Sequence, residues 1–591
     1  MDERDKIKGD RRGTDHQRLE QELNEYLDKK YKGKNTISAP QLNPEPGGDD
    51  LGEDGVWSKI NFDLRPEELV AYLDQYVVRQ DEAKAVLATK VCTHFNRARY
   101  LSRTGGDDPA DGVGLIKNNV LMIGPTGVGK TYLVKLIAAK LGVPFVKGDA
   151  TKFSETGYVG GDVEDLVREL VNEANDDIEL AQYGIIYIDE IDKIASSRHL
   201  IGPDVSRTGV QRALLKPMEE TEVDLKTPHD PISQIQAIEK YRRTGQREKR
   251  TVNTRHILFI MSGAFSELAE QIKKRTNRQG MGFRAEVCDQ TPDHDYLKEV
   301  TAQDLVEFGF ENEFVGRLPV TVVLEELSED DLYQILKNPN NPVVISKKRD
   351  FASYGIDLRL EDEALRMLAH QAVQLKTGAR ALVSVLEKAL LPFETRLPST
   401  EVKRLLLTPE VVRDPEGELK RLLEEGESPE LVQRFEAAVR AERMELLKMI
   451  AKRESLYEER LDRPLSPRRM DLIADEYYRS GMALGLAFER VLERLEEIRD
   501  FEDGFYATYS LEIVFDESAE AAILAGAAEQ RVGVSTFLNQ LSKVLEPGLR
   551  LVRERTGLSN FVLPEEAVTQ TDAYLSRLFT NHYRKTLGED L

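Results

Sequence analysis

The order of apolar and polar positions between residues 120 and 327 indicates strands that alternate with helices. Five apolar runs are candidates for buried strands, and segments with helical spacing separate them. The runs lie at residues 120–124, 143–149, 184–190, 256–265 and 318–327. Such alternation is typical of a parallel, doubly wound sheet with helices on its faces. The pattern therefore predicts an α/β fold.

A purely helical pattern follows nearer the C-terminus, at residues 428–461 and 467–500. The apolar positions recur at helical spacing, and they include Leu431, Phe435, Val439, Leu446, Ile450, Leu472, Leu484, Phe488, Val491 and Leu495. Ser428 followed by Pro429 is typical of a helix start, and Pro464 separates the two segments. They predict a helical hairpin whose arms are each about 50 Å long at 1.5 Å per residue.

One stretch of the chain recurs when the sequence is shifted by 155 residues. Nine identical residues align without a gap between positions 364–410 and 519–565, and the apolar pattern is kept. The first members of the nine pairs are Ala364, Ala372, Gly378, Leu386, Lys388, Leu390, Pro392, Pro409 and Glu410. The ungapped register favours duplication over coincidence.

Composition and charge narrow the classes of function. The 591 residues exceed what one hydrophobic core usually organises, so about three or four structural units are expected. A net charge of −23 argues against a protein that binds a nucleic-acid backbone. The only cysteines, Cys92 and Cys288, make neither a disulfide framework nor a paired-cysteine zinc site. No leader-like segment or run of about 18 apolar residues is present, which predicts a soluble cytoplasmic protein without zinc or a membrane span.

The sharpest chemical signal is the sequence GPTGVGKT between the first apolar run and a helical segment. It consists of Gly124, Pro125, Thr126, Gly127, Val128, Gly129, Lys130 and Thr131. In this context the glycines let backbone N–H groups converge on phosphate oxygens at a helix N-terminus. Lys130 is expected to reach the β- and γ-phosphates of ATP, and the Thr131 hydroxyl to ligate Mg²⁺. A chance glycine-rich turn is the weaker interpretation.

A partner carboxylate for this loop is expected at the end of a second buried strand. The sequence GIIYIDE supplies Asp189, a candidate Mg²⁺ ligand, and Glu190, a candidate base that polarises the attacking water. Alone, an apolar run that ends in Asp-Glu is more often a strand that leads into a helix cap. Ser262, at the end of the fourth run, is a weaker candidate to sense the γ-phosphate.

These motifs belong to a longer resemblance, which covers about 60% of the chain, from about residue 64 to residue 412. The matching segments are YLDQYVVRQDEAKAVLA, GPTGVGKT, GYVGGDVEDLV, GIIYIDEIDKI, DVSRTGVQRALLK, FVGRLPV and KTGARAL. In order and spacing they closely resemble the ClpX family of AAA+ unfoldases, and more distantly HslU. The resemblance implies an AAA+ large domain, an α-rich small domain or lid, and hydrolysis of ATP.

The resemblance also implies roles for residues that carry no clear signal alone. Arg317 matches the arginine that reaches the γ-phosphate of a neighbouring subunit, so it implies a homo-oligomer, which in this family is a hexameric ring. Arg380 matches the sensor arginine of the lid. Tyr76, Val77 and Val78 match the segment that contacts adenine. As bare residues, the arginines would be surface ion pairs and the adenine segment would be core.

The loop GYVG is implied to project into the central pore of that ring. Its Tyr158 and Val159 would grip an unfolded polypeptide, since an aromatic ring contacts any chain by burying area. For an isolated loop, a tyrosine folded back onto its own domain would be favoured. The tripeptide Met281-Gly282-Phe283 occupies the place of the loop that docks a ClpP-like peptidase. Methionine is an unusual first residue there, and a loop anchored on its own domain is the alternative.

Other parts of the sequence depart from the family. Its N-terminal zinc-binding domain is replaced by one short helix at residues 16–30 and a Pro/Gly/Asp-rich linker. A longer insertion at about residues 223–254 carries a basic cluster, which is either a solvated face or a site for acidic substrate tails. The second copy of the repeat has Ser535 where the lid has Arg380, which predicts that this copy does not contact nucleotide.

The predicted organisation has six parts. These are an N-terminal helix and linker (1–60), the AAA+ large domain (61–340), the small domain or first lid (341–412), the helical hairpin (413–508), the second lid (509–577) and a C-terminal tail (578–591). The expected function is an ATP-dependent, ring-forming protein unfoldase and translocase, the ATPase component of a Clp-type protease or chaperone system. The alternative is a stand-alone remodelling ATPase that dismantles one protein complex without a peptidase. The pore loop and the acidic net charge speak against a nucleic-acid motor.

Overall fold

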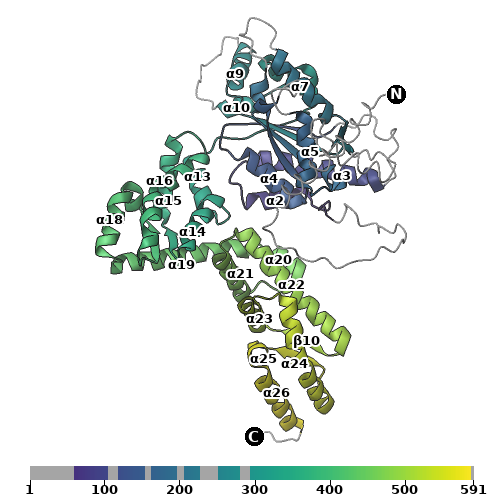
Figure 1. Cartoon of the computed structure of the whole chain (residues 1–591), viewed down its shortest axis with the longest axis vertical. Helices are drawn as coiled ribbons and strands as arrows, with labels where there is room; N and C mark the ends of the chain where they lie inside the picture. Colours follow the sequence, from purple (N-terminus) through teal and green to yellow (C-terminus); the bar gives the residue numbers. More distant parts are fainter. Residues whose placement is uncertain are drawn as a thin grey trace, which may run out of the picture. The chain divides into compact units, whose positions relative to one another are not determined.

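The computed structural model describes residues 59–103, 117–153, 162–195, 205–225, 251–279 and 293–586 (Figure 1). The chain divides into two units, Met1–Gly55 and Val56–Leu591, and everything below concerns the second. The predicted N-terminal helix and the basic cluster of the insertion lie outside the described residues. Among the residues described, every helix is too short or too polar to span a bilayer.

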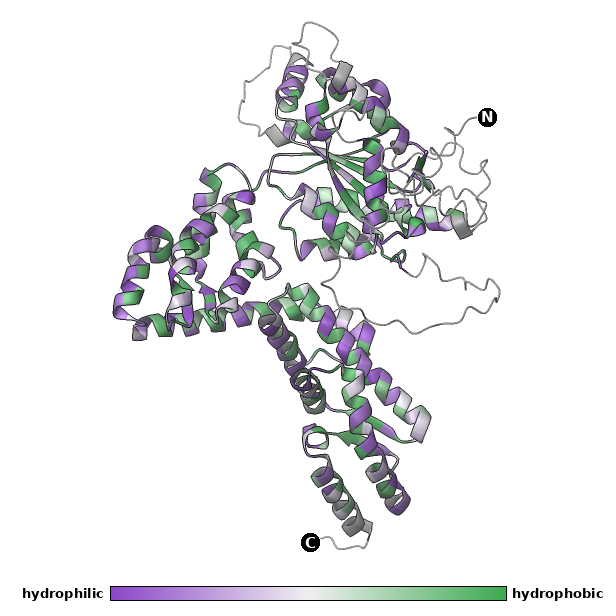
Figure 2. Cartoon of the chain, viewed as in Figure 1, coloured by the Kyte–Doolittle hydropathy of each residue, from purple (hydrophilic) through white to green (hydrophobic). Residues whose placement is uncertain are grey.

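The centre of the fold is a parallel sheet of five strands in the order β2-β3-β6-β1-β7. The strands are β1 (Val120–Ile123), β2 (Phe145–Asp149), β3 (Ile185–Asp189), β6 (Leu258–Gly263) and β7 (Val320–Val323). Each lies within one of the five apolar runs, so the predicted α/β, doubly wound sheet is confirmed. Figure 2 shows hydrophobic residues gathered on these strands.

The strands are apolar at successive positions because both faces of the sheet are buried. Val120 and Met122 of β1 enter one hydrophobic cluster, whereas Leu121 and Ile123 enter another. This alternation follows from the two-residue period of a strand. The first cluster contains residues of α2, α3 and α4, and the second contains residues of α5, α7 and α9. Helices therefore pack on both faces.

The other elements of this part of the chain are helices and one short antiparallel strand pair. The helices are α2 (Pro66–Asp74), α3 (Asp81–Arg103), α4 (Lys130–Leu141), α5 (Val163–Glu173), α6 (Ile178–Ala181), α7 (Val205–Met218), α9 (Leu268–Gln279), α10 (Asp293–Lys298), α11 (Ala302–Phe308) and α12 (Asn312–Gly316). The pair is β4 (Glu222–Asp224) and β5 (Thr251–Asn253). Short 3₁₀ helices span Ala150–Lys152 and Ile191–Ile194.

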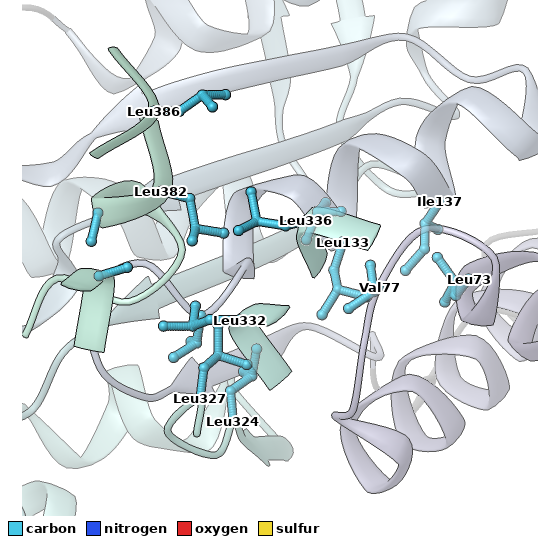
Figure 3. Close-up of a cluster of buried hydrophobic side chains, with 14 of the residues drawn as sticks. Leu73, Val77, Leu133, Ile137, Leu324, Leu327, Leu332, Leu336, Leu382 and Leu386 are labelled. Carbon is cyan, nitrogen blue, oxygen red and sulfur yellow. The ribbon is translucent and has the colours of Figure 1, made fainter. Parts of the chain in front are cut away.

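A helical region with one parallel strand pair follows β7. It contains α13 (Glu329–Lys337), α14 (Pro342–Ser353), β8 (Asp357–Leu360), α15 (Asp362–Gln374), α16 (Arg380–Arg396), a 3₁₀ turn (Leu397–Ser399), β9 (Arg404–Leu407) and α17 (Pro409–Arg413). Its core is continuous with one face of the large sheet. In Figure 3, Leu133 of α4 lies in the same cluster as Leu332 of α13 and Leu382 of α16.

The predicted helical hairpin is present, but both of its arms are broken. The structure has α18 (Pro415–Glu425), α19 (Pro429–Ala451), α20 (Glu454–Leu461), α21 (Pro467–Ser480) and α22 (Leu484–Tyr509). The first arm is interrupted at Lys452 and Arg453, and the second at Gly481, which adopts a φ of +59°. Continuous arms of about 50 Å were therefore a wrong prediction. The helix start at Ser428 is confirmed, because its side chain accepts a hydrogen bond from the Leu431 N–H.

The last elements repeat the order of the first lid. They are β10 (Glu512–Phe515), α23 (Glu517–Gln530), α24 (Val534–Thr556), β11 (Asn560–Leu563), α25 (Glu565–Thr569) and α26 (Thr571–Thr586). β10 pairs in parallel with β11, as β8 does with β9. A shift of 155 residues places β8 on β10 residue for residue. This shared order supports the duplication, which stays a prediction. Residues 446–567 contribute a hydrophobic core of their own.

Candidate nucleotide site

The GPTGVGKT loop connects β1 to α4 and turns tightly enough to need glycine at two positions. Gly127 has a φ of +80°, and Gly129, the residue before α4, has a φ of +96°. A side chain at Gly127 would also overlap the backbone carbonyl of Thr377. Only glycine adopts these angles without strain. The loop thus presents the N-terminus of α4, where unpaired N–H groups attract anions.

The side chain of Lys130 lies across this loop. Its ammonium donates hydrogen bonds to the carbonyls of Gly124 at 2.6 Å and Pro125 at 2.9 Å. Burial lowers the pKa of Lys130 to about 8. An anion bound in the loop would favour the charged form and raise that pKa.

Asp189 ends β3 and belongs to a chain of hydrogen bonds that leads back to the loop. The Ser262 hydroxyl donates to Asp189 Oδ1 at 2.7 Å and lies 2.6 Å from the Tyr187 hydroxyl. The Thr131 hydroxyl donates to Tyr187 at 3.1 Å. Burial alone raises the pKa of Asp189, but hydrogen bonds from Lys147 and Ser262 hold it below the ordinary value. Asp189 is therefore ionised, and it is linked to Thr131 through Tyr187.

This arrangement fits the predicted Mg²⁺ ligands and places Ser262 below them. Mg²⁺ prefers oxygen ligands, and proteins hold it by one or two carboxylates together with phosphates and water. The Thr131 hydroxyl and the Asp189 carboxylate are such oxygens. Ser262 is fully buried, donates a hydrogen bond to Asp189 and does not line the cavity, and its contact with the γ-phosphate stays a prediction. Tyr187, which links these groups, carried no signal in the sequence beyond being a polar-tipped residue in an apolar run.

Glu190 follows Asp189 in an uncommon backbone conformation. Its φ of 57° and ψ of 33° lie in the left-handed region, which residues other than glycine seldom adopt. Strained backbone of this kind is concentrated at functional sites. The side chain is exposed and lines the same cavity as Lys130. The strained turn therefore directs a carboxylate toward the loop.

A cavity with a volume of about 560 Å³ joins these groups to two further segments. Tyr76, Val77 and Val78, between α2 and α3, line it, as do Asn341 and Arg380 from the first lid. The lid also touches the loop directly, because the Ala379 N–H donates to the Gly127 carbonyl at 2.9 Å. The structure thus brings together the predicted base segment, the phosphate loop, the two acidic residues and Arg380.

Arg317 does not line this cavity. It follows α12 and forms an ion pair with Glu219 at 2.5 Å, with about half of each side chain exposed. Arg317 lines a separate cavity with a volume of about 210 Å³, together with Lys117 and His94. Burial lowers the pKa of Lys117 to about 7 and that of His94 to about 4. The position of Arg317 away from the nucleotide cavity is compatible with the predicted action on a neighbouring subunit.

Several predicted residues lie outside the described part of the chain. These are the pore-loop residues Tyr158 and Val159 and the docking residues Met281, Gly282 and Phe283. In the described residues, no group of three or more His, Cys, Asp or Glu side chains is arranged to hold a metal ion. A two-ligand Mg²⁺ site completed by phosphates does not require one.

Comparisons with known proteins agree with this geometry. Residues 116–321 match the model of the AAA domain (Cdc48 subfamily), and residues 327–398 match that of the C-terminal, D2-small domain of ClpB protein. Two relatives are each named "ATP-dependent Clp protease ATP-binding subunit ClpX", from Borrelia duttonii (strain Ly) and Borrelia recurrentis (strain A1). Each is 41% identical over 350 residues, which is 59% of this chain and 78% of the relative. This level of identity, together with the phosphate loop, the acidic end of β3 and the lid, shows that the chain is an ATPase. The chain belongs to the ClpX family of AAA+ proteins.

Proposed function

We propose that this ATPase is a ring-forming protein unfoldase and translocase that serves as the ATPase component of a Clp-type protease or chaperone system. The observation that carries the proposal is the nucleotide cavity, which is lined by both the large sheet domain and Arg380 of the first lid. A ligand that contacts two domains, and binds one of their relative arrangements more tightly than another, shifts the equilibrium toward that arrangement. The printed name of the relatives, a protease ATP-binding subunit, supports the link to proteolysis.

The predicted site residues of the large domain that line the cavity have roles in this proposal. Lys130 and the N-terminus of α4 bind the β- and γ-phosphates of ATP, and Tyr76, Val77 and Val78 contact the base. Thr131 and Asp189 hold Mg²⁺, which neutralises charge on the phosphates. Glu190 polarises the attacking water. The other residues of the loop, from Gly124 through Gly129, contribute backbone N–H groups, except Pro125, which has none.

Arg317 acts in trans in this proposal, and the active form is a hexameric ring. A guanidinium suits that role because it stays charged and binds phosphate oxygens bidentately. Its ion pair with Glu219 is exposed, and pairs of this kind contribute little to stability. Release of Arg317 toward a neighbouring nucleotide therefore costs little.

Substrate grip is assigned to Tyr158 and Val159, and peptidase docking to Met281-Gly282-Phe283. A second candidate is the stand-alone remodelling ATPase, favoured by one observation. The elements α20–α26 have their own hydrophobic core and lie beyond the residues that the two family models match, so they are free to serve target recognition in this alternative. In that case the target is a specific protein complex, and no peptidase is engaged.

The function is tested by separating ATP turnover from mechanical work. Glu190→Gln is expected to keep ATP binding and to lose turnover, because the water lacks its polarising carboxylate while Lys130 remains. Tyr158→Ala is expected to keep most turnover but to stop unfolding of a folded, tagged substrate. Unfolding at the wild-type rate in Tyr158→Ala would contradict the unfoldase. Failure of the wild-type protein to stimulate a ClpP-like peptidase from the same cell would favour the stand-alone remodeller.

A further inference from the structure

The two breaks in the helical hairpin contact the segment that lines the base end of the nucleotide cavity. At the first break, Arg453 Nη2 donates a hydrogen bond to the side-chain oxygen of Gln75 at 2.6 Å. At the second, α22 begins, and the backbone N–H of Gly485 donates to Asn340 Oδ1 at 3.0 Å. Gln75 directly precedes Tyr76, which lines the cavity. The breaks therefore bring the hairpin to the nucleotide site.

Asn340 connects α22 to the backbone of the base segment. Its side chain is almost fully buried, and its amide nitrogen donates to the Gln75 carbonyl at 2.9 Å while its oxygen accepts from Gly485. Both ends of the amide are used, so its orientation is determined. The next residue, Asn341, lines the cavity and caps α14. A shift of the first turn of α22 is thus transmitted to two lining segments.

Gly485 of α22 also packs closely against the side chain of Tyr76. A methyl group built on Gly485 would overlap the Tyr76 hydroxyl oxygen, whereas Cζ of the same ring would lie 3.1 Å away. The Arg453 guanidinium lies over the ring of Phe488, 5.2 Å from its centroid, and Phe488 is fully buried in α22. The absence of a side chain at Gly485 therefore allows Tyr76 its position beside the cavity.

We propose that Arg453, Gly485 and Asn340 are positioning residues for the base segment, so that the region from α19 to α26 sets the affinity of the site for adenine nucleotides. The inference rests on the proposed contact of Tyr76, Val77 and Val78 with the base. It gives the C-terminal region a way to report on nucleotide and to regulate it. Because coupling between two sites is reciprocal, nucleotide binding also stabilises the contact between α22 and Asn340.

The sharpest test is the pair Gly485→Ala and Tyr76→Phe. Gly485→Ala displaces the Tyr76 ring and is expected to raise the Kd for ATP and ADP by about tenfold. It does not weaken α22, since alanine is a better helix former than glycine. Tyr76→Phe removes the overlapping oxygen, so the double variant should return to the Kd of Tyr76→Phe alone. Independent, additive effects of the two substitutions would overturn the proposal.

Arg453→Ala tests the other break, with Arg443→Ala as the matched control. Arg443 also lies in the hairpin, but it pairs with Asp471 and Asp475 of α21. Arg453→Ala should raise the Kd for ATP and the KM by about tenfold and leave kcat at saturating ATP unchanged, because Asp189 and Glu190 are untouched. Arg443→Ala should change none of them. Equal losses in both variants, or no loss in Arg453→Ala, would overturn the inference.

Hydrogen exchange supplies the reciprocal measurement on the wild-type chain. ADP at saturation is expected to slow exchange in the peptide that contains Gly485, and not in peptides of α25. Unchanged exchange at Gly485 while ADP binds would contradict the coupling but leave the nucleotide site intact. ATP binding that is as tight in Lys130→Ala as in the wild type would instead contradict the proposed site itself.

Discussion

The helices α16 and α24 begin within one residue of each other in the register of the predicted repeat, yet their N-termini meet different partners. At α16, Arg380 lines the nucleotide cavity and the Ala379 N–H binds the Gly127 carbonyl of the phosphate loop. At α24, the N–H and the hydroxyl of Ser535 both donate to one carboxylate oxygen of Glu497, at 3.1 and 2.7 Å. A helix N-terminus attracts an anion in either case. In the second lid the chain supplies that anion itself.

The cores of the two lids also differ, because an apolar residue of the first lid corresponds to a charged residue of the second. Leu365 of the first lid is an apolar core residue, and the position 155 residues later is Glu520, which is also buried. Glu520 forms ion pairs with Arg469 at 2.8 Å and with Arg463 at 2.8 Å. Both arginines belong to the helical hairpin, since Arg469 lies in α21 and Arg463 lies between α20 and α21. At these two positions the second lid therefore bonds to residues of the hairpin, whereas Arg380 of the first lid lines the nucleotide cavity.

The largest expected effect concerns Glu520. Glu520→Leu, which places the corresponding residue of the first lid at this position, leaves Arg469 without a carboxylate partner and Arg463 with Glu502 alone. Breaking a buried ion pair in this way costs about 3–5 kcal/mol, measured as faster hydrogen exchange in β10 and α23. Adding Arg469→Met should recover part of the loss, because an apolar pair tolerates burial. Unchanged exchange in Glu520→Leu would mean that the ion pairs do not hold the second lid.

The next effect is a pH dependence confined to the site of the first lid. Lys130 has a pKa of about 8, and its charged form binds phosphate. Below pH 8 the ammonium is present, and as the pH rises through 8 it is lost, so the Kd for ATP should increase by up to about tenfold per pH unit. Lys130→Arg should flatten the profile, since a guanidinium stays charged, and Ser535→Ala should leave it as in the wild type. A Kd that is constant from about pH 7 to 9.5 would exclude Lys130 as the titrating group.

Sequence patterns predicted the scaffold well, and contacts between distant segments poorly. The five strands, and the assembly of Lys130, Asp189 and Glu190 at one edge of the sheet, follow from local signals. Runs of consecutive apolar residues mark the strands, and the polar motifs directly follow the strand ends. The breaks at Arg453 and Gly481 were missed, because a helical period continues across an interruption of one or two residues. The burial of Ser262 beneath Asp189 depends on neighbours from other strands, which no local pattern encodes.

A smaller effect concerns the first turn of α24. Ser535→Ala removes the hydroxyl that donates a hydrogen bond to Glu497, and the loss of one such hydrogen bond costs about 1 kcal/mol. Faster hydrogen exchange is expected in the first turn of α24 and not in α16. Glu497→Gln keeps an acceptor and should have a smaller effect. Equal exchange in Ser535→Ala and the wild type would show that Glu497 does not stabilise this helix start.

The central claim is that ATP is hydrolysed in the cavity that the first lid lines, and that the second lid takes no part. The most direct test is the rate of ATP turnover at saturating ATP for Arg380→Ala and Ser535→Ala, measured side by side with the wild type. Arg380→Ala is expected to lose turnover by roughly 100-fold, the scale of removing one stabilising donor. Ser535→Ala is expected to keep the wild-type rate, because Ser535 binds Glu497. Comparable losses in the two variants would contradict the account.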